Sequence, residues 1–399
     1  METAYIVDII RTPVGRYGGA LSSVRPDDLA AHVIKGLIER NNSLPAELIE
    51  DVIFGAANQA GEDNRNVARM AALLAGLPIT VGGVTVNRLC ASGLQAIMDA
   101  ARSLMLSEAG AYIAGGVESM SRAPFVSAKP ETAFSRNAET YDTTIGWRFI
   151  NKKLADMHYP YGMGETAENV ADQWQVSRAE QDQFALASQE KYWQAETQGK
   201  FVDEIYPVSV PQRKSADKIV KRDEHPRKTS IDQLGRLKPA FKENGSVTAG
   251  NSAGINDGAA ACLIVSKETL KKYSLQPLVK VVSMAITGVS PDIMGIGPVE
   301  ATNKALTRAG LQITDIGLVE LNEAFASQSL ACIRELELDA DIVNVNGGSI
   351  AIGHPLGASG ARISATLIHE MRRRSTKYGL ATMCVGVGQG AAIIYENCQ

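Results

Sequence analysis

Short apolar runs alternate with segments of helical periodicity in the first 120 residues of the chain. Apolar runs at 5–10, 51–54 and 111–114 have the length of buried strands. After Pro26, apolar residues recur at helical spacing between positions 29 and 38, which predicts an amphipathic helix. This alternation of strands and helices predicts α/β units around a largely parallel sheet.

The last part of the chain, from about residue 270, repeats that alternation. Apolar runs at 279–285, 318–321 and 342–345 predict strands, and the pattern at 299–309 predicts a helix between them. The segment between the two α/β regions has fewer glycines and more polar residues and prolines. It contains Ser177-Arg178-Ala179-Glu180, a capping box that predicts the start of a helix.

A short sequence repeat links the first and last regions. Ala91-Ser92-Gly93 recurs as Ala358-Ser359-Gly360, and each copy opens an alanine-rich helix. An apolar strand that ends in glycine follows each helix, at 113–116 and at 383–386. We therefore predict one βαβ-type unit used twice, with an inserted domain after the first copy.

Composition and charge narrow the class of protein. Of the 399 residues, 45% are hydrophobic and 21% are charged, as in ordinary globular proteins. The formal net charge of −4 argues against nucleic acid or an anionic membrane as partner. The first residues lack the features of a signal peptide, and no apolar run has the length of a membrane helix. We expect a cytoplasmic protein.

The cysteine pattern argues against disulfides and metal binding and leaves a reactive role open for at least one cysteine. Five cysteines without a CxxC pair, and histidines without HxxxH spacing, argue against a disulfide framework and a zinc site. Cys90 follows an apolar stretch and precedes a predicted helix. Because the N-terminal end of a helix dipole favours a thiolate, we expect a lowered pKa and a nucleophile. The alternative is a buried structural cysteine, and this motif alone leaves the two about equal.

Three further motifs place polar groups where predicted strands end. His354 lies in the glycine-rich stretch 346–360 and is a candidate base. A phosphate-binding loop is the alternative for this stretch, but neither the P-loop pattern nor GxGxxG is present, which argues against nucleotide hydrolysis. Cys384 leaves a strand into a glycine turn, and Asn322 follows the strand at 318–321. Open α/β sheets place their sites at such strand ends.

These motifs, in this order over essentially the whole chain, resemble those of the thiolase family, as do residues 10–15, 115–121 and 248–251. The resemblance implies the thiolase fold: two duplicated βαβ-type core domains form a layered α/β/α/β/α sandwich with an inserted, mainly helical loop domain. It implies an N-terminal core domain of residues 1–120 plus about 249–270, which holds the nucleophilic cysteine. The loop domain at 121–248 would bind CoA, and the C-terminal core domain at 271–399 would hold the histidine and second cysteine.

The resemblance also implies an acyltransferase that cleaves a 3-oxoacyl-CoA between C2 and C3. Cys90 would attack and become acylated, His354 would activate it and later the CoA thiol, and Cys384 would exchange the proton at C2. His354 and a water bound to Asn322 would hold the enolate oxygen. The N–H groups of Cys90 and Gly386 would hold the tetrahedral oxyanion. No cofactor and no metal are expected, because CoA and acyl-CoA are substrates.

Within the family, residues 15–25, 60–70 and 142–149 resemble the 3-oxoadipyl-CoA thiolases of aromatic compound catabolism (the beta-ketoadipate pathway). The expected products are succinyl-CoA and acetyl-CoA. The alternatives are a 3-ketoacyl-CoA thiolase of fatty acid beta-oxidation and an acetyl-CoA C-acetyltransferase, although Gly162 replaces a histidine frequent in the acetoacetyl-CoA type. A ketoacyl synthase or a non-catalytic acyl-CoA-binding module would not need Cys384 beside Cys90 and His354.

Binding residues form the last set of expectations. Residues 213–228 contain seven basic and three acidic side chains, and we assign Arg227 and Lys228 to the adenine-nucleotide end of CoA. Arg148 is the candidate partner of a distal substrate carboxylate, and a surface or interface arginine is an equal alternative. Ser252 lies one position from a serine that contacts pantetheine in relatives, so its role stays open. The other expected substrate-pocket residues are Met163, Met294 and Phe325, and the family resemblance implies a homo-oligomer, either a tetramer or a dimer.

Overall fold

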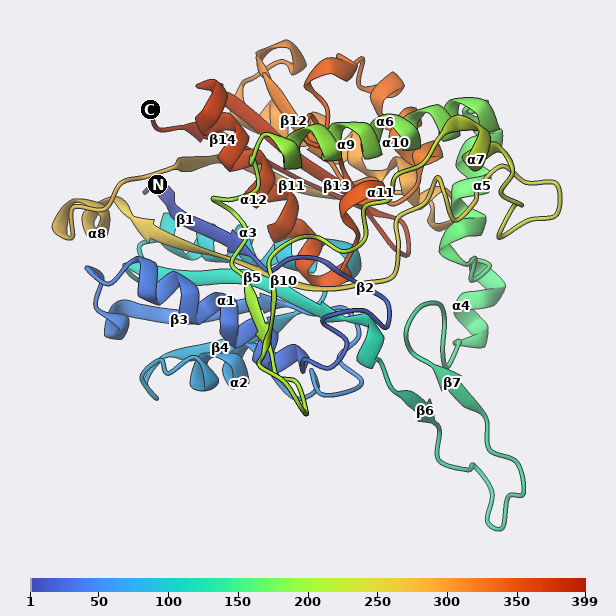
Figure 1. The fold of residues 1–399 in the computed structure, drawn as a ribbon, viewed down its shortest axis with the longest axis horizontal. Helices are drawn as coiled ribbons and strands as arrows, with labels where there is room; N and C mark the ends of the chain where they lie inside the picture. The colour runs from blue at the N-terminus through green and yellow to red at the C-terminus, as the bar shows by residue number, and fades with distance from the viewer. Residues whose placement is uncertain (1) are drawn as a thin grey trace.

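In the computed structural model, which describes residues 2–399, a ten-stranded sheet runs through the molecule (Figure 1). The strand order is β12-β13-β14-β11-β1-β10-β5-β3-β4, and β2 pairs with β10. The strands are β1 (Ala4–Arg11), β2 (Gly15–Arg16), β3 (Ile49–Gly55), β4 (Gly82–Val86), β5 (Ala111–Ser119), β10 (Asn256–Ser266), β11 (Val279–Gly288), β12 (Leu318–Leu321), β13 (Tyr378–Val385) and β14 (Gln389–Asn397).

The sheet consists of two halves with the same succession of strands. Only two residue pairs, Tyr5 with Lys280 and Ile6 with Val279, join β1 to β11. Outward from this join, β1, β10, β5 and β3 in one half correspond to β11, β14, β13 and β12 in the other. In each half the first two pairings are antiparallel and the third is parallel. This symmetry is what a duplicated unit predicts.

Two details of the predicted sheet are wrong. The sheet is mixed rather than largely parallel, because β14 returns from β13 through the short turn at 386–388 and must pair antiparallel. The strand expected at 342–345 is reduced to a single bridge between Val343 and Val319. Asn344 takes a positive φ of 45° there and turns the chain away.

The helices complete a five-layer arrangement. α3 (Ser92–Met105) and α12 (Leu356–Arg374) lie between the two halves of the sheet and share one core cluster with both. α1 (Pro26–Arg40) and α2 (Val67–Leu74) cover the outer face of the first half. α9 (Gly297–Ala309) and α10 (Ala326–Glu335) cover the second. The α/β/α/β/α layering is therefore confirmed.

The repeated glycines explain why the two central helices come so close. A Cβ atom at Gly93 of α3 would lie 2.8 Å from the Gly357 carbonyl oxygen, and one at Gly360 of α12 would clash with the Leu94 backbone. The same Gly357 oxygen lies against Gly116 of β5. The Ala-Ser-Gly repeat thus marks the contact between the duplicated halves.

The regular structure of the segment between the halves is mainly helical, as expected, with α4 (Lys152–Met157), α5 (Met163–Gln173), α6 (Arg178–Thr197) and α7 (Ile231–Gly235) joined by long loops. The predicted capping box is confirmed: Glu180 N donates to Ser177 Oγ at 3.3 Å, and Ser177 N donates to Glu180 Oε2 at 2.8 Å. β6 (Phe125–Ser127) and β7 (Thr140–Asp142) form a hairpin that projects from the body (Figure 1). The remaining strands and α-helices are the hairpin strands β8 (Val208–Val210) and β9 (Lys218–Val220) and the short helices α8 (Lys267–Lys272) and α11 (Ser349–Ile352).

Residues 2–399 bear on three expectations from the sequence, which concern disulfides, metal sites and membrane-spanning helices. All five cysteines are free thiols. Within this range no group of three or more His, Cys, Asp or Glu side chains is arranged to hold a metal ion. None of the helices described is both long and apolar enough to cross a bilayer. The domain boundaries inferred from the family resemblance stay predictions.

Candidate active site

Cys90 lies in a tight 3-10 turn, Leu89–Ala91, between β4 and α3. Leu89 has a positive φ of 48°, which a leucine rarely adopts. Two side chains hold this strained turn: Asn87 Oδ1 accepts from Leu89 N at 2.8 Å, and Ser92 Oγ donates to Leu89 O at 2.6 Å. The backbone strain is therefore located beside the cysteine.

The prediction that the pKa of Cys90 is lowered is wrong. Burial raises the pKa of this thiol to about 11, although the backbone N–H groups of Gly386 and of Cys90 itself act in the opposite direction. The helix-terminus effect falls within about 0.3–1 kcal/mol at exposed sites, which is smaller than the desolvation of a thiolate in a partly buried position such as that of Cys90. Cys90 is thus a thiol at neutral pH and requires a base to become a nucleophile. The two backbone N–H groups that lower this pKa are the same two that the family resemblance assigns to the oxyanion hole.

His354 lies in the turn before α12 and is 5% exposed. Its Nδ1 is 2.6 Å from Ser359 Oγ, and the Ser359 hydroxyl donates to Pro355 O at 2.8 Å. Because that hydroxyl has one proton, Ser359 Oγ accepts from Nδ1–H, which leaves the lone pair of the neutral ring on Nε2. Burial, aided by the charge of Arg362, lowers the pKa of His354 to about 3. The imidazole is therefore neutral and can accept a proton at Nε2.

Asn322 is brought next to this nitrogen. It follows β12 directly, is fully buried, and its backbone N–H donates to Thr382 O of β13 at 3.0 Å. Its side-chain Nδ2 lies 3.5 Å from His354 Nε2. Two residues that are 32 positions apart in sequence thus form one polar pair at the ends of neighbouring elements.

Cys384 lies near the end of β13 and is almost fully buried. Burial raises the pKa of its thiol well above the usual value, and the nearby Cys90 contributes. Cys384 belongs to one apolar cluster with Met163, Met294 and Phe325. The structure therefore gathers all three of the expected apolar pocket residues around the second cysteine.

A cavity of about 390 Å³ opens onto Cys90. Gly386, Met163 and Arg148 contribute to its lining, and so does Leu356, two residues after His354. Arg148 Nη2 donates to Asn58 Oδ1 at 2.7 Å in the cavity wall. The nucleophile candidate and the proposed carboxylate partner consequently share one cavity.

Glu118 is a cavity residue that the sequence motifs did not single out. It is 2% exposed and accepts hydrogen bonds from the backbone N–H groups of Ala57, Asn58 and Gly357. Burial raises the pKa of its carboxyl to about 7. A lone acidic residue in an otherwise apolar strand was the signal for it.

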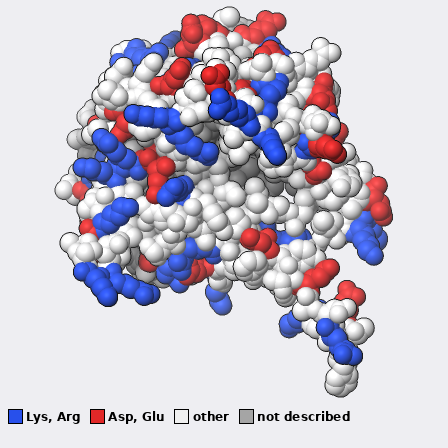
Figure 2. Space-filling view, turned by 45° about the vertical axis from the view of Figure 1, so that its right-hand side comes forward, with Lys and Arg blue, Asp and Glu red and all other residues white. Residues whose placement is uncertain are grey.

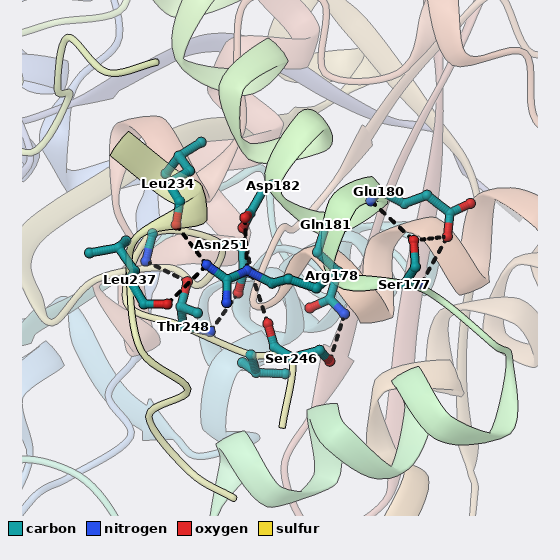
Figure 3. Close-up of polar contacts among 12 residues, drawn as sticks. Ser177, Arg178, Glu180, Gln181, Asp182, Leu234, Leu237, Ser246, Thr248 and Asn251 are labelled. Atoms are coloured by element: carbon teal, nitrogen blue, oxygen red, sulfur yellow. Dashed lines mark hydrogen bonds and ion pairs between the residues drawn. The ribbon is translucent and has the colours of Figure 1, made fainter. Parts of the chain in front are cut away.

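Ser252 does not present a free hydroxyl. Its Oγ donates to Thr248 O at 2.7 Å, and the residue is 6% exposed. The loop before it is anchored to α6, because Asn251 Nδ2 donates to Asp182 Oδ1 at 2.9 Å and Asn251 Oδ1 accepts from Thr248 N at 2.7 Å (Figure 3). Arg178 in turn donates to Asp182 Oδ2 at 2.7 Å. The hydroxyl at position 252 therefore serves the loop itself.

The basic stretch at 213–228 does not form one surface. Asp223 turns inward and accepts from buried Arg11 at 2.6 Å, while Arg222 pairs with Glu196 at 2.9 Å. Arg227 and Lys228 lie beside α6, where Arg227 N donates to Gln189 Oε1 at 2.8 Å and Lys228 Nζ lies 5.6 Å from the Trp193 ring centroid. Arg227 and Lys228 are therefore placed together beside one helix, and their role in binding CoA stays a prediction.

Comparison with known proteins identifies relatives over the full length. The family models "Thiolase, N-terminal domain" and "Thiolase, C-terminal domain" match residues 4–268 and 275–397. The 3-oxoadipyl-CoA/3-oxo-5,6-dehydrosuberyl-CoA thiolase of Escherichia coli K12 is 55% identical, and the beta-ketoadipyl-CoA thiolase of Pseudomonas putida is 54% identical. Each alignment covers 100% of both chains.

Solved structures with the same fold include two enzymes that are each 40% identical to this chain. The acetyl-CoA acetyltransferase of Bacillus anthracis is 40% identical, with a TM-score of 0.94 and coverage of 100% of this chain and 99% of its own. Human mitochondrial 3-ketoacyl-CoA thiolase in complex with CoA is also 40% identical, with a TM-score of 0.92 and coverage of 100% and 98%.

Proposed function

The chain belongs to the thiolase family and is an acyltransferase, and on that premise we propose that it cleaves 3-oxoadipyl-CoA with CoA into succinyl-CoA and acetyl-CoA. The observation that carries the proposal is the 54–55% identity, from end to end, to thiolases named for this substrate. The acetyl-CoA acetyltransferase of Chromobacterium violaceum is 47% identical. The degradation of aromatic compounds is the setting that this substrate implies.

The first half-reaction begins at Cys90. Its sulfur attacks C3 of the substrate while its proton moves to Nε2 of His354, the nitrogen that carries the lone pair. The C2–C3 bond then breaks, and its electron pair forms the enolate of acetyl-CoA. Cys384 donates a proton to C2, for which its raised pKa suits it, because such a thiol keeps its proton at neutral pH.

The second half-reaction returns the enzyme to its starting state. His354 passes its proton to the Cys384 thiolate, so both residues are reset when acetyl-CoA leaves. It then takes the proton of the incoming CoA thiol, whose sulfur attacks the acyl group on Cys90. The Cys90 thiolate leaves and recovers its proton from His354. The CoA proton thus replaces the one that ended on acetyl-CoA.

Negative charge develops on two oxygens in turn. The N–H groups of Cys90 and Gly386, both of which lower the pKa of the Cys90 thiol, would bind the tetrahedral oxyanion. His354 and a water on Asn322 Nδ2 would bind the enolate oxygen. Loss of one such donor typically lowers the rate about 10²–10³-fold.

Arg148 is our candidate for the distal carboxylate that distinguishes 3-oxoadipyl-CoA from unsubstituted acyl chains. It lines the same cavity as Cys90, and a guanidinium can bind a carboxylate with two parallel hydrogen bonds. Because Arg148 lines this cavity, a role in substrate recognition is better supported than the alternative of an ordinary surface arginine.

CoA would approach past Arg227 and Lys228, which we propose contact its phosphates. Figure 2 shows lysine and arginine side chains, with some acidic ones among them, above a hollow on the face that it draws. Basic groups beside a hollow favour an anionic ligand. We further propose a homo-oligomeric cytoplasmic enzyme that uses no cofactor. Phe125 and Phe134 on the projecting hairpin are 72% and 100% exposed, which supports assembly with further copies.

The decisive experiment compares kcat/KM for 3-oxoadipyl-CoA, acetoacetyl-CoA and a medium-chain 3-oxoacyl-CoA with the full chain. We expect 3-oxoadipyl-CoA to be preferred by at least about tenfold, which is 1.4 kcal/mol of differential transition-state binding. Preference for either of the other substrates would instead assign the enzyme to short-chain or fatty acid metabolism.

A further inference from the structure

Arg362 is a buried arginine behind the candidate active site. It lies on α12, is 1% exposed, and donates from Nη2 to Ser349 Oγ at 2.6 Å. Its carboxylate neighbour Glu320 is 3.6 Å away at Oε2, which is longer than a hydrogen bond. The short contact of this guanidinium is therefore made to a serine, not to a counter-ion.

The hydrogen bonds that connect Arg362, Ser349 and Asn322 can run in one donor-to-acceptor direction only. An arginine can only donate, so Ser349 Oγ accepts from Arg362, and the single hydroxyl proton is left for another acceptor. That acceptor is Oδ1 of Asn322, 2.6 Å away. Because Oδ1 is occupied by this proton, the NH2 group is the end of the Asn322 amide that faces Nε2 of His354.

We infer that Ser349 and Arg362 are positioning residues that hold the amide of Asn322 so that its NH2 group, and not its carbonyl, faces the reaction centre. Arg362 fixes the Ser349 hydroxyl, and Ser349 fixes Asn322. Ser359 fixes the ring of His354 from the other side. Each hydrogen bond along the path from Arg362 to Nε2 of His354 then has one defined donor and one defined acceptor.

The orientation matters for the enolate. When Nδ2 donates to the bound water, the water oxygen is the acceptor and both of its protons stay available, one of them for the enolate oxygen. A flipped amide would accept a proton from that water and turn a carbonyl oxygen toward the lone pair on Nε2. The inference rests on the proposed function, because it acts through the roles proposed for Asn322 and His354.

A double-mutant cycle tests this role by its coupling to Asn322. We expect Ser349→Ala to lower kcat for thiolysis about 10–100-fold, by analogy with the loss of a hydrogen-bond partner behind a metal-ligating residue, with KM for CoA changed less than twofold. In an Asn322→Ala background the same substitution should change kcat less than twofold. Ser349→Thr, which keeps the hydroxyl, should retain most of the activity.

The matched control is Ser364→Ala on α12, another buried serine, whose hydroxyl bonds Gly360 O and Tyr395 instead. It should leave kcat within about twofold. If Ser349→Ala does not fold, Ser349→Cys replaces it, because a thiol is only slightly larger than a hydroxyl but is a weak donor.

An equal loss in the wild-type and Asn322→Ala backgrounds would overturn the inference. So would a loss that appears in KM alone. Absence of thiolysis in the wild-type enzyme would instead reject the proposed function, so the two failures are distinguishable.

Discussion

Nη2 of Arg148 donates a 2.7 Å hydrogen bond to Oδ1 of Asn58 in the wall of the cavity that contains Cys90. Asn58 is itself fixed, because its backbone N–H donates to the buried carboxyl of Glu118 at 3.2 Å. Among residues 2–399, the hydrogen bonds of the Arg148 side chain all go to Asn58. The guanidinium is thus held at one nitrogen while its remaining donors are left for a ligand.

Replacing Arg148 should separate two substrates. Arg148→Ala is expected to lower kcat/KM for 3-oxoadipyl-CoA about 10–100-fold, because a charge-assisted hydrogen-bonded pair contributes about 1.5–3 kcal/mol. The value for acetoacetyl-CoA, which has no distal carboxylate, should change less than about threefold. Steady-state kinetics with both substrates measure the difference.

The control for Arg148 is the conservative variant Arg148→Lys. It keeps the charge but loses the planar fork, so an intermediate loss confined to 3-oxoadipyl-CoA is expected. Equal losses on both substrates would show that Arg148 does not recognise the carboxylate selectively.

The raised pKa of Cys90 predicts how its labelling depends on pH. Below a pKa of about 11, the thiolate fraction increases about tenfold per pH unit. Alkylation of Cys90 by iodoacetamide in the free enzyme should therefore keep accelerating from pH 7 to pH 10, whereas an ordinary cysteine levels off near pH 9. Mass spectrometry of the Cys90 peptide measures the rate.

Two variants complete that experiment. Cys90→Ser should abolish the labelled peptide and lower thiolysis at least about 10³-fold, since the nucleophile is lost. Cys398→Ser, which removes a half-buried thiol near the C-terminus, should leave thiolysis unchanged. A labelling rate that reaches its plateau below pH 8.5 would contradict the predicted protonated thiol.

The basic residues beside α6 can be tested against basic residues elsewhere in the same stretch. The double variant Arg227→Ala and Lys228→Ala should raise KM for CoA about 5–50-fold, because phosphate contacts to charged groups contribute about 1.5–3 kcal/mol each before solvent screening. The effect should shrink at high salt. Arg213→Ala with Lys214→Ala removes the same charge from the exposed segment between β8 and β9 and should leave KM for CoA within twofold. Similar effects of both variants would indicate a general charge effect rather than a binding site.

Gly116 is the site of a predicted loss of stability. A methyl group there would clash with the Gly357 carbonyl oxygen across the contact between β5 and α12. Gly116→Ala should lower the free energy of unfolding by more than about 3 kcal/mol, measured by urea denaturation. Gly235→Ala, where open space surrounds the new methyl group, should be neutral within about 0.5 kcal/mol. Equal stability of the two variants would contradict this account of the helix contact.

Local features of the fold were predictable, whereas strand partners were not. The apolar spacing after Pro26 and the capping box at Ser177 depend only on residues that are close in sequence. Both correspond to observed helices. The pairing of β10 with both β1 and β5 depends on a segment that follows the whole insertion. Periodicity does not show which distant strand is the partner, so the alternation of strands and helices led to the expectation of a largely parallel sheet.

The residues of the candidate site show the same contrast between local sequence signals and distant contacts. Cys90, His354 and Asn322 follow strand or turn signals and were found from their motifs. Ser349 and Arg362 were not, because their contacts cross 27 and 13 positions and depend on how three elements meet. The Cys90 pKa was mispredicted for the same reason: a helix terminus is visible in the sequence, but the degree of burial is not.

The position of β10 also constrains the order in which the chain can fold during its synthesis. β1 and β5 are made long before residues 256–266, which must enter between them. Until the ribosome has translated the entire insertion, these two strands expose unpaired edges to other nascent chains. The N-terminal half can therefore complete its sheet only late in translation, and slowed elongation through the insertion should extend the period in which the unfinished chain needs chaperones.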